Sequence, residues 1–329
     1  MSYVPFQNAD IICGRFIALL EKHGIHSPIG SALEDELLSL PKLLEIVKNP
    51  SIASGKDEAA ILRSAAGIHD LAAKVLSIEC LAEFSEFLPH LKLIGENKIP
   101  TASLIQNAQS ASSDDTSRKI AELYLGCLAA HVGDQVRLDS PTAAKGDNPD
   151  VIFRATPCDG TAPRKWALAI KTISSTQGQT IFDRIAEGAK QIDRPECKAD
   201  VGMVVINAKS ALKHNALWDA NFQSLQEAID ALKAQLCDLI AAAEKDREQS
   251  EWDQLFTGKV VRPILFMGQT LVHLATSAGD KTPTSVKMLA PYDANGLVDP
   301  QAHGLSYMMN HFMQTVLLGN PGGEGYLPS

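Results

Sequence analysis

Residues 149–175, PDVIFRATPCDGTAPRKWALAIKTISS, decide the fold that we expect of this chain. They contain two short runs of apolar and β-branched residues, 151–155 and 166–173, with Gly, Pro and Asp between them. Short runs bounded by such turn residues are typical of β-strands. We expect a further strand before this segment, at 135–138, and a fully apolar strand after it, at 201–206.

Helical patterns surround these strands. Apolar residues recur at helical spacing over 116–131, and again over 180–192 between the last two strands. The order helix, three strands, helix, strand predicts an α/β (or α+β) fold, with a mixed sheet flanked by helices. Further along, we expect a long helix at 224–248, a strand at 260–267 and a helix around 305–318.

The pattern changes along the chain and predicts three regions. The N-terminal third has only helical periodicity, and the small polar residues at 107–117 indicate a linker. We expect a helical N-terminal domain (1–112), a sheet-containing core with an added helix and strand (113–275) and a C-terminal extension (276–329). Because the N-terminal helices contain no cluster of catalytic residue types, we expect this region or the C-terminal one to bind a partner protein.

Composition and charge exclude several classes of protein. The chain has 329 residues, of which 45% are hydrophobic and 21% charged, as in folded globular proteins. No apolar run reaches the about 18 residues of a membrane span. The N-terminus lacks signal-peptide features, so we expect a cytoplasmic protein without a membrane partner. The six cysteines lie far apart, without metal-binding spacing, which indicates reduced thiols.

The net charge of −9 argues against a broadly basic nucleic-acid-binding protein, because contacts to phosphates require Lys or Arg. One region differs from this average. Residues 141–215 contain eleven Lys and Arg against eight Asp and Glu, a local excess of three positive charges. Any contact with nucleic acid is therefore expected in this region.

Three residues on neighbouring predicted elements form the best candidate site: Glu122, Asp150 and Lys171. Glu122 lies in the helix at 116–131, Asp150 opens one strand, and Lys171 lies near the end of the next strand. Adjacent strands can bring an acid and a lysine to the same edge of a sheet. Carboxylates bind Mg²⁺, which polarises a phosphate and activates water, and a lysine can position that water. The arrangement favours metal-dependent phosphodiester cleavage.

On these residues and this order of elements, segment 116–208 resembles the PD-(D/E)XK nuclease superfamily, the restriction-endonuclease-like fold. Glu122 matches the acid of the family's first core helix, Asp150 the acid before the second strand, and Lys171 the motif lysine. The resemblance implies Mg²⁺ (or Mn²⁺) bound by Asp150, Glu122 and the backbone carbonyl of Ile170. It also implies a nuclease with DNA as the expected substrate, as in prokaryotic restriction or anti-phage defence.

The resemblance has one departure, because Ala169 stands two residues before Lys171, where the family has Glu or Asp. Three explanations compete. The alanine replaces a natural glutamate by design; or the domain is a natural pseudonuclease kept for binding; or the carboxylate has moved to the following helix, as Glu187 or Asp183. Gln191, near the end of that helix, matches a glutamine that faces the active site in several subfamilies.

Several polar residues of the basic region are suited to a phosphate backbone, and we expect them to line a positive groove. Two follow Lys171 in a loop and the others are basic: Ser174, Ser175, Arg164, Lys165, Lys190 and Lys209.

Two other interpretations stay open. In one, the chain is a catalytically dead, nuclease-like DNA-binding or scaffold subunit of a multiprotein complex. In the other, it is an unrelated α/β protein in which Glu122 is a surface acid, Asp150 a turn residue and Lys171 an edge lysine with its amine in water. A structure distinguishes the last interpretation, because Asp150 and Lys171 would then lie apart.

Overall fold

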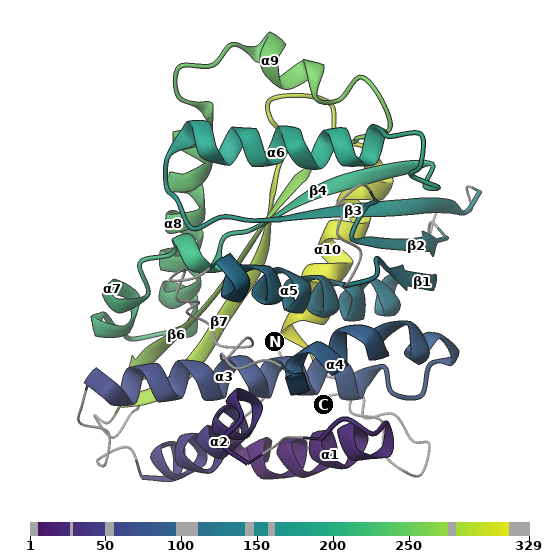
Figure 1. The fold of residues 1–329 in the computed structure, drawn as a ribbon. Helices are drawn as coiled ribbons and strands as arrows, with labels where there is room; N and C mark the ends of the chain where they lie inside the picture. The colour runs from purple at the N-terminus through teal and green to yellow at the C-terminus, as the bar shows by residue number, and fades with distance from the viewer. Residues whose placement is uncertain are drawn as a thin grey trace.

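The computed structural model of the chain is shown in Figure 1. It describes residues 6–26, 29–49, 56–96, 111–141, 148–156, 162–275 and 281–315. Its N-terminal part is helical, as the sequence predicts. The helices there are α1 (Ala9–Lys22), α2 (Ala32–Lys48), α3 (Lys56–Ser77) and α4 (Leu88–Glu96), with short 3₁₀ turns at Phe6–Asn8 and Ala82–Phe87.

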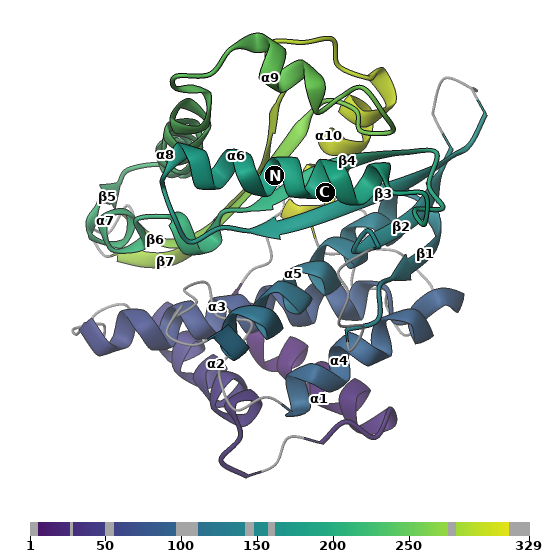
Figure 2. The same ribbon diagram turned by 45° about the horizontal axis from the view of Figure 1, so that its top comes forward.

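The centre of the chain forms the predicted sequence of elements. Its order is α5 (Ala111–Val132), β1 (Asp134–Leu138), β2 (Val151–Ala155), β3 (Arg164–Thr172), α6 (Gly178–Asp193) and β4 (Val201–Asn207). The first three strands pair antiparallel, and β3 pairs with β4 in parallel through the α6 crossover. The expectation of a mixed sheet flanked by helices is confirmed, with α5 on one face and α6 on the other (Figures 1 and 2).

The C-terminal part extends this sheet in the order β1-β2-β3-β4-β6-β5, with β7 also paired to β6. Its elements are the 3₁₀ turn Lys209–Ala211, α7 (His214–Asp219), β5 (Asn221–Phe222), α8 (Leu225–Glu244), α9 (Gln249–Gln254), β6 (Ile264–Ala275), β7 (Lys281–Tyr292) and α10 (Pro300–Gln314). The predicted long helix at 224–248 corresponds to α8, which ends at Glu244, and the short helix α9 follows the predicted segment.

Strand β7 is absent from our sequence-based prediction. It pairs with β6 along its whole length, from Ile264↔Tyr292 to Ala275↔Lys281. Pro283 and Pro291 argue against a strand in the sequence, because proline cannot donate a backbone hydrogen bond. In the fold β7 has β6 as its one described neighbour, and an edge strand tolerates proline.

The apolar core lies on both faces of the sheet. Along β3, Leu168 and Ile170 belong to the cluster on the α5 face, whereas Ala167 and Ala169 belong to the cluster on the α6 face, since side chains alternate along a strand. Figure 2 shows α5 between the sheet and the layer formed by α1–α4. The α5-face cluster therefore extends without interruption from the N-terminal helices to the sheet.

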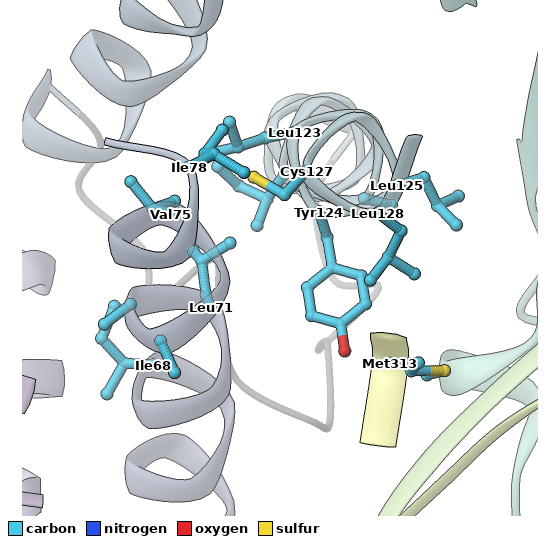
Figure 3. Close-up of a cluster of buried hydrophobic side chains, with 14 of the residues drawn as sticks. Ile68, Leu71, Val75, Ile78, Leu123, Tyr124, Leu125, Cys127, Leu128 and Met313 are labelled. Atoms are coloured by element: carbon cyan, nitrogen blue, oxygen red, sulfur yellow. The ribbon is translucent and has the colours of Figure 1, made fainter. Parts of the chain in front are cut away.

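The N-terminal helices pack directly against α5 and α10. Figure 3 shows Ile78, just after α3, beside Leu123 and Cys127 of α5, and Met313 of α10 on the side of α5 where Tyr124 lies. The three-domain division stays a prediction, but this shared core means that α1–α4 and the sheet stabilise each other. In the described part of the chain, no helix is both long and apolar enough to cross a membrane.

Candidate functional site

Asp150 lies at the point where the pairing of β2 with β3 ends. Its backbone N–H donates to the carbonyl of Leu168 (3.0 Å), as a strand residue would. One step further along β3, the N–H of Ile170 donates to Oδ2 of Asp150 at 2.5 Å. The Asp150 carboxylate thus takes the place of a backbone carbonyl of β2 and accepts the next hydrogen bond from β3. This places it between the two faces of the sheet, within reach of side chains from both.

Glu122 reaches Asp150 from α5. Both side chains are buried, with 4% and 7% of the residue surface exposed, and the charge of Glu122 acts on the Asp150 carboxyl group. Burial and then the charge of Glu122 raise the pKa of Asp150 to about 7, and burial also raises the pKa of Glu122. Two buried carboxylates that repel each other retain a proton, so the pair still holds one close to neutral pH.

Lys171 approaches from the α6 face. Its charge acts on Asp150 and opposes the rise in that pKa, so the two side chains lie within electrostatic range. The Lys171 amine also lies 3.2 Å from a carboxylate oxygen of Glu187 on α6, whose other oxygen accepts from Arg184 at 2.6 Å. The structure therefore brings Glu122, Asp150 and Lys171 together from α5, β2 and β3. This argues against the interpretation in which Asp150 and Lys171 lie apart.

Ala169 packs inside the apolar cluster between β3 and α6. Ala169 is fully buried. A Cβ atom added to Gly188 of α6 would lie 3.5 Å from the Cβ atom of Ala169. The helix therefore sits close against position 169, and an alanine fits this packing. Of the two acids considered as substitutes, Glu187 contacts Lys171, whereas Asp183 accepts from Gln179 at 2.7 Å.

Gln191 and Ile170 support the site mainly through backbone contacts. The Gln191 side chain is buried, and its amide nitrogen donates to the carbonyl of Asn148, two residues before Asp150. Its amide oxygen has no hydrogen-bond partner among the described residues. Ile170 contacts Asp150 through its N–H, whereas the resemblance implies that its carbonyl binds the metal.

The predicted nucleic-acid contacts do not gather around Lys171. Arg164 and Lys165 open β3, whereas Lys171 is near its end, about 20 Å away at the usual rise of a strand. Arg164 forms an ion pair with Asp299 at 2.8 Å. Lys209 follows β4 at the same end of the sheet as Lys171, but its side chain is buried. Charge alone suggested these three residues, and charge shows neither which end of a strand a residue occupies nor whether its side chain is buried.

The other predicted contacts lie nearer to the site. Ser174 and Ser175 follow β3, and the hydroxyl of Ser175 accepts from the N–H of Gln177 at 3.1 Å. Lys190 is exposed on α6. A positive surface that includes Lys171 is thus restricted to the loop after β3 and the exposed side of α6.

Three residues that our sequence analysis missed surround the carboxylates. Lys119 donates to Glu122 at 2.9 Å, and His90 of α4 lies 3.2 Å from the same carboxylate. Asp139 follows β1, and its N–H donates to the carbonyl of Asp150 at 3.0 Å. Lys119 was detectable from its helical spacing to Glu122, and Asp139 from the antiparallel pairing of β1 with β2. No local pattern links His90 to this site.

Two further findings bear on identity. Within the described ranges, no group of three or more His, Cys, Asp or Glu side chains is arranged to bind a metal ion. The chain matches no protein-family model, no curated protein and no solved structure.

Proposed function

We propose that this chain is a metal-dependent nuclease, related to the PD-(D/E)XK enzymes and weakened by Ala169, that hydrolyses phosphodiester bonds of DNA. The observation that carries the proposal is the convergence of Glu122, Asp150 and Lys171 on one edge of the sheet. The order α5-β1-β2-β3-α6-β4 supports it, because the resemblance implies this order of elements. A role in restriction or anti-phage defence, in the cytoplasm and with a partner protein, belongs to the same proposal.

The two carboxylates are suited to a magnesium ion that keeps most of its waters. Mg²⁺ is commonly bound by one or two protein carboxylates together with waters and substrate phosphates. Burial and then repulsion from Glu122 raise the pKa of Asp150 to about 7, and a divalent cation would relieve that repulsion. Asp150 and Glu122 would hold the ion. When bound, it would polarise the phosphate and lower the pKa of a coordinated water.

The side chains on the α6 face would supply the remaining functions. Lys171 is a fixed positive charge beside Asp150 and would orient the attacked phosphate or the attacking water. Glu187 holds the Lys171 amine. Partial burial raises the pKa of Glu187, but hydrogen bonds from Arg184 and Lys171 outweigh this effect and lower it. We therefore propose Glu187 as the partial substitute for the acid missing at Ala169.

A second candidate function is a nuclease-like DNA-binding or scaffold subunit without catalytic activity. The complete burial of Ala169 against α6 favours it, because that packing leaves the site one carboxylate short of the family pattern. Binding through the loop after β3 would then remain without cleavage. The two candidates differ in one measurable property, metal-dependent hydrolysis.

The deciding experiment incubates the full chain with plasmid DNA, single-stranded DNA and RNA in Mg²⁺ or Mn²⁺. We expect slow DNA cleavage that falls about 100-fold or more in Asp150→Asn and Lys171→Met, because metal-assisted charge stabilisation contributes several kcal/mol. Asp183→Asn is the matched control, since Asp183 lies one turn before Glu187 but contacts Gln179.

Other outcomes discriminate between the candidates. Nucleic-acid binding without cleavage under any condition supports the binding subunit. A large gain of cleavage in Ala169→Glu would mean that the missing acid alone limits the enzyme and that Glu187 does not replace it. A chain that neither binds nor cuts nucleic acid would contradict both functions.

A further inference from the structure

One side chain from the N-terminal helices enters the candidate site. His90 lies on α4, with 1% of its surface exposed, and its Nε2 is 3.2 Å from Oε2 of Glu122. The resemblance that identifies Glu122 and Asp150 covers residues from 116 onward and assigns nothing to this histidine. The contact therefore joins a region outside the nuclease-like segment to one of its proposed metal ligands.

The ring nitrogen of His90 that faces Glu122 donates a hydrogen bond to its carboxylate. A neutral ring carries one N–H, and the ring nitrogen that faces a carboxylate is the one that keeps its hydrogen. His90 thus holds one oxygen of Glu122, and the amine of Lys119 lies 2.9 Å from the other.

The second ring nitrogen shows that packing alone does not explain this residue. Nδ1 of His90 is buried and has no hydrogen-bond partner within the described ranges. A buried polar atom without a partner costs stability, so an apolar side chain would serve packing better at this position. The contact with Glu122 is the feature that an apolar residue would lose.

We propose that His90 is a positioning residue for Glu122, through which the N-terminal helices set the geometry of the metal site. The inference rests on the proposed function, since it assumes that Glu122 and Asp150 hold the ion. Lys119 also holds Glu122, but it belongs to the same helix and cannot transmit the position of another segment. Any partner that shifts α4 would act on Glu122 through His90.

Calorimetric titration of the full chain with Mn²⁺ tests this proposal without requiring cleavage. Outer-shell partners of metal ligands are worth about 10- to 100-fold in affinity. We expect His90→Leu to weaken Mn²⁺ binding by that factor. His90→Gln should stay close to wild type, because its amide nitrogen reaches the place of Nε2. His90→Asn, equally polar but shorter, should resemble His90→Leu and serves if the leucine variant fails to fold.

His69 on α3 provides the matched control, because it is as buried as His90 and packs on Phe6 at a ring distance of 5.2 Å. We expect His69→Leu to bind Mn²⁺ like the wild type. Equal losses in the His69 and His90 variants, or wild-type affinity in His90→Asn, would overturn the positioning role. If Asp150→Asn also binds Mn²⁺ like the wild type, the proposed metal site fails instead.

Discussion

Asp70 and Asp150 are both buried aspartates on the α5 side of the molecule, yet their carboxyl groups behave in opposite ways. Burial raises the pKa of both. At Asp70 the charges of Lys287 and Lys74 outweigh burial, and the pKa is lowered. At Asp150 the nearest charge is another acid, Glu122, and the pKa is raised to about 7. The neighbours, and not the degree of burial, decide which form of the acid is stable.

The two sites also differ in how many elements satisfy the carboxylate. Asp70 of α3 forms an ion pair with Lys287 of β7 and accepts from Tyr124 of α5 (2.7 Å) and Gln269 of β6 (2.9 Å). Four elements thus meet at one fully satisfied charge. Asp150 has a backbone donor in Ile170 and an unfavourable neighbour in Glu122. The first arrangement serves stability, whereas the second keeps a repulsion that a bound cation would relieve.

The largest expected effect comes from breaking the Asp70 network. Asp70→Asn keeps the shape of the side chain but leaves the buried ammonium of Lys287 without its counter-charge. Removing one partner of a buried ion pair costs about 3–5 kcal/mol. We expect a loss of this size in the free energy of unfolding, measured by urea denaturation at pH 7.

The control is Lys287→Met combined with Asp70→Leu, which removes both charges. Replacing a buried pair by apolar residues is often neutral. The double variant should therefore recover much of the loss. A single variant as stable as the wild type would show that Lys287 finds another partner.

Replacing Asp150 by asparagine is expected to change stability in the opposite direction, towards a more stable protein. The pKa of Asp150 is about 7 in the folded state and 3.8 as an unperturbed group. Between these values the folded chain holds a proton that the unfolded chain has lost, so this group's contribution to stability falls as pH rises from 4 to 7. Asp150→Asn removes the penalty, and we expect it to stabilise the protein by about 1–4 kcal/mol at pH 8.

Thermal unfolding with and without Mn²⁺ sharpens this prediction. A ligand that binds the folded state raises its stability by mass action. The wild type should gain stability on adding Mn²⁺, whereas Asp150→Asn should not. If asparagine destabilises the chain at pH 8, the hydrogen bonds that Asp150 accepts outweigh its repulsion with Glu122.

Part of the Asp150 site could be predicted from the sequence. The strands around Asp150 were predictable because β2 and β3 are short, apolar and bounded by Gly and Pro. Their order with α6 and β4 predicted a mixed sheet in which adjacent strands could bring Asp150 towards Lys171. This part of the site depends on local patterns and on simple rules of strand pairing.

The rest of the site depends on contacts between distant segments. His90 reaches Glu122 across 32 residues, and Asp70 reaches Lys287 across 217. No local sequence pattern predicts either contact. The periodicity of a helix identifies its buried face, but it does not identify which distant segment packs on that face. A distant contact can also remove an expected function. The positive charge of Arg164 suggested binding to nucleic acid, but Asp299 neutralises this charge in an ion pair.

A smaller, pH-dependent effect is expected from Lys74, the second lysine near Asp70. Burial, and then the like charge of Lys287, lower the pKa of Lys74 to about 7 from 10.5. Between these values the unfolded chain holds a proton that the folded chain has lost, so this lysine makes stability rise with pH. Lys74→Met should reduce the slope of the unfolding free energy by about 1.4 kcal/mol per pH unit between pH 7.5 and 9.

The change of the unfolding free energy with pH, rather than its value at one pH, is the quantity to compare. The Lys74 amine also donates to the carbonyls of Phe312 and Thr315 at the end of α10, and methionine loses those hydrogen bonds at every pH. Lys190→Met, on the exposed side of α6, is the control and should leave the slope unchanged. An unchanged slope in Lys74→Met would mean that Lys74 stays protonated in the folded chain at pH 9.

The smallest change in stability is expected at Glu187. Its pair with Lys171 is half-exposed on the Glu187 side, so water screens the attraction and the pair contributes at most about 1 kcal/mol. Glu187→Gln should therefore unfold within about 1 kcal/mol of the wild type. If Glu187 substitutes for the acid missing at Ala169, the same variant should lose DNA cleavage while Asp183→Asn keeps it. If Glu187→Gln loses both stability and activity, Glu187 is a structural residue. If the variant keeps full activity, Glu187 does not substitute for the missing acid and Lys171 functions without a carboxylate on α6.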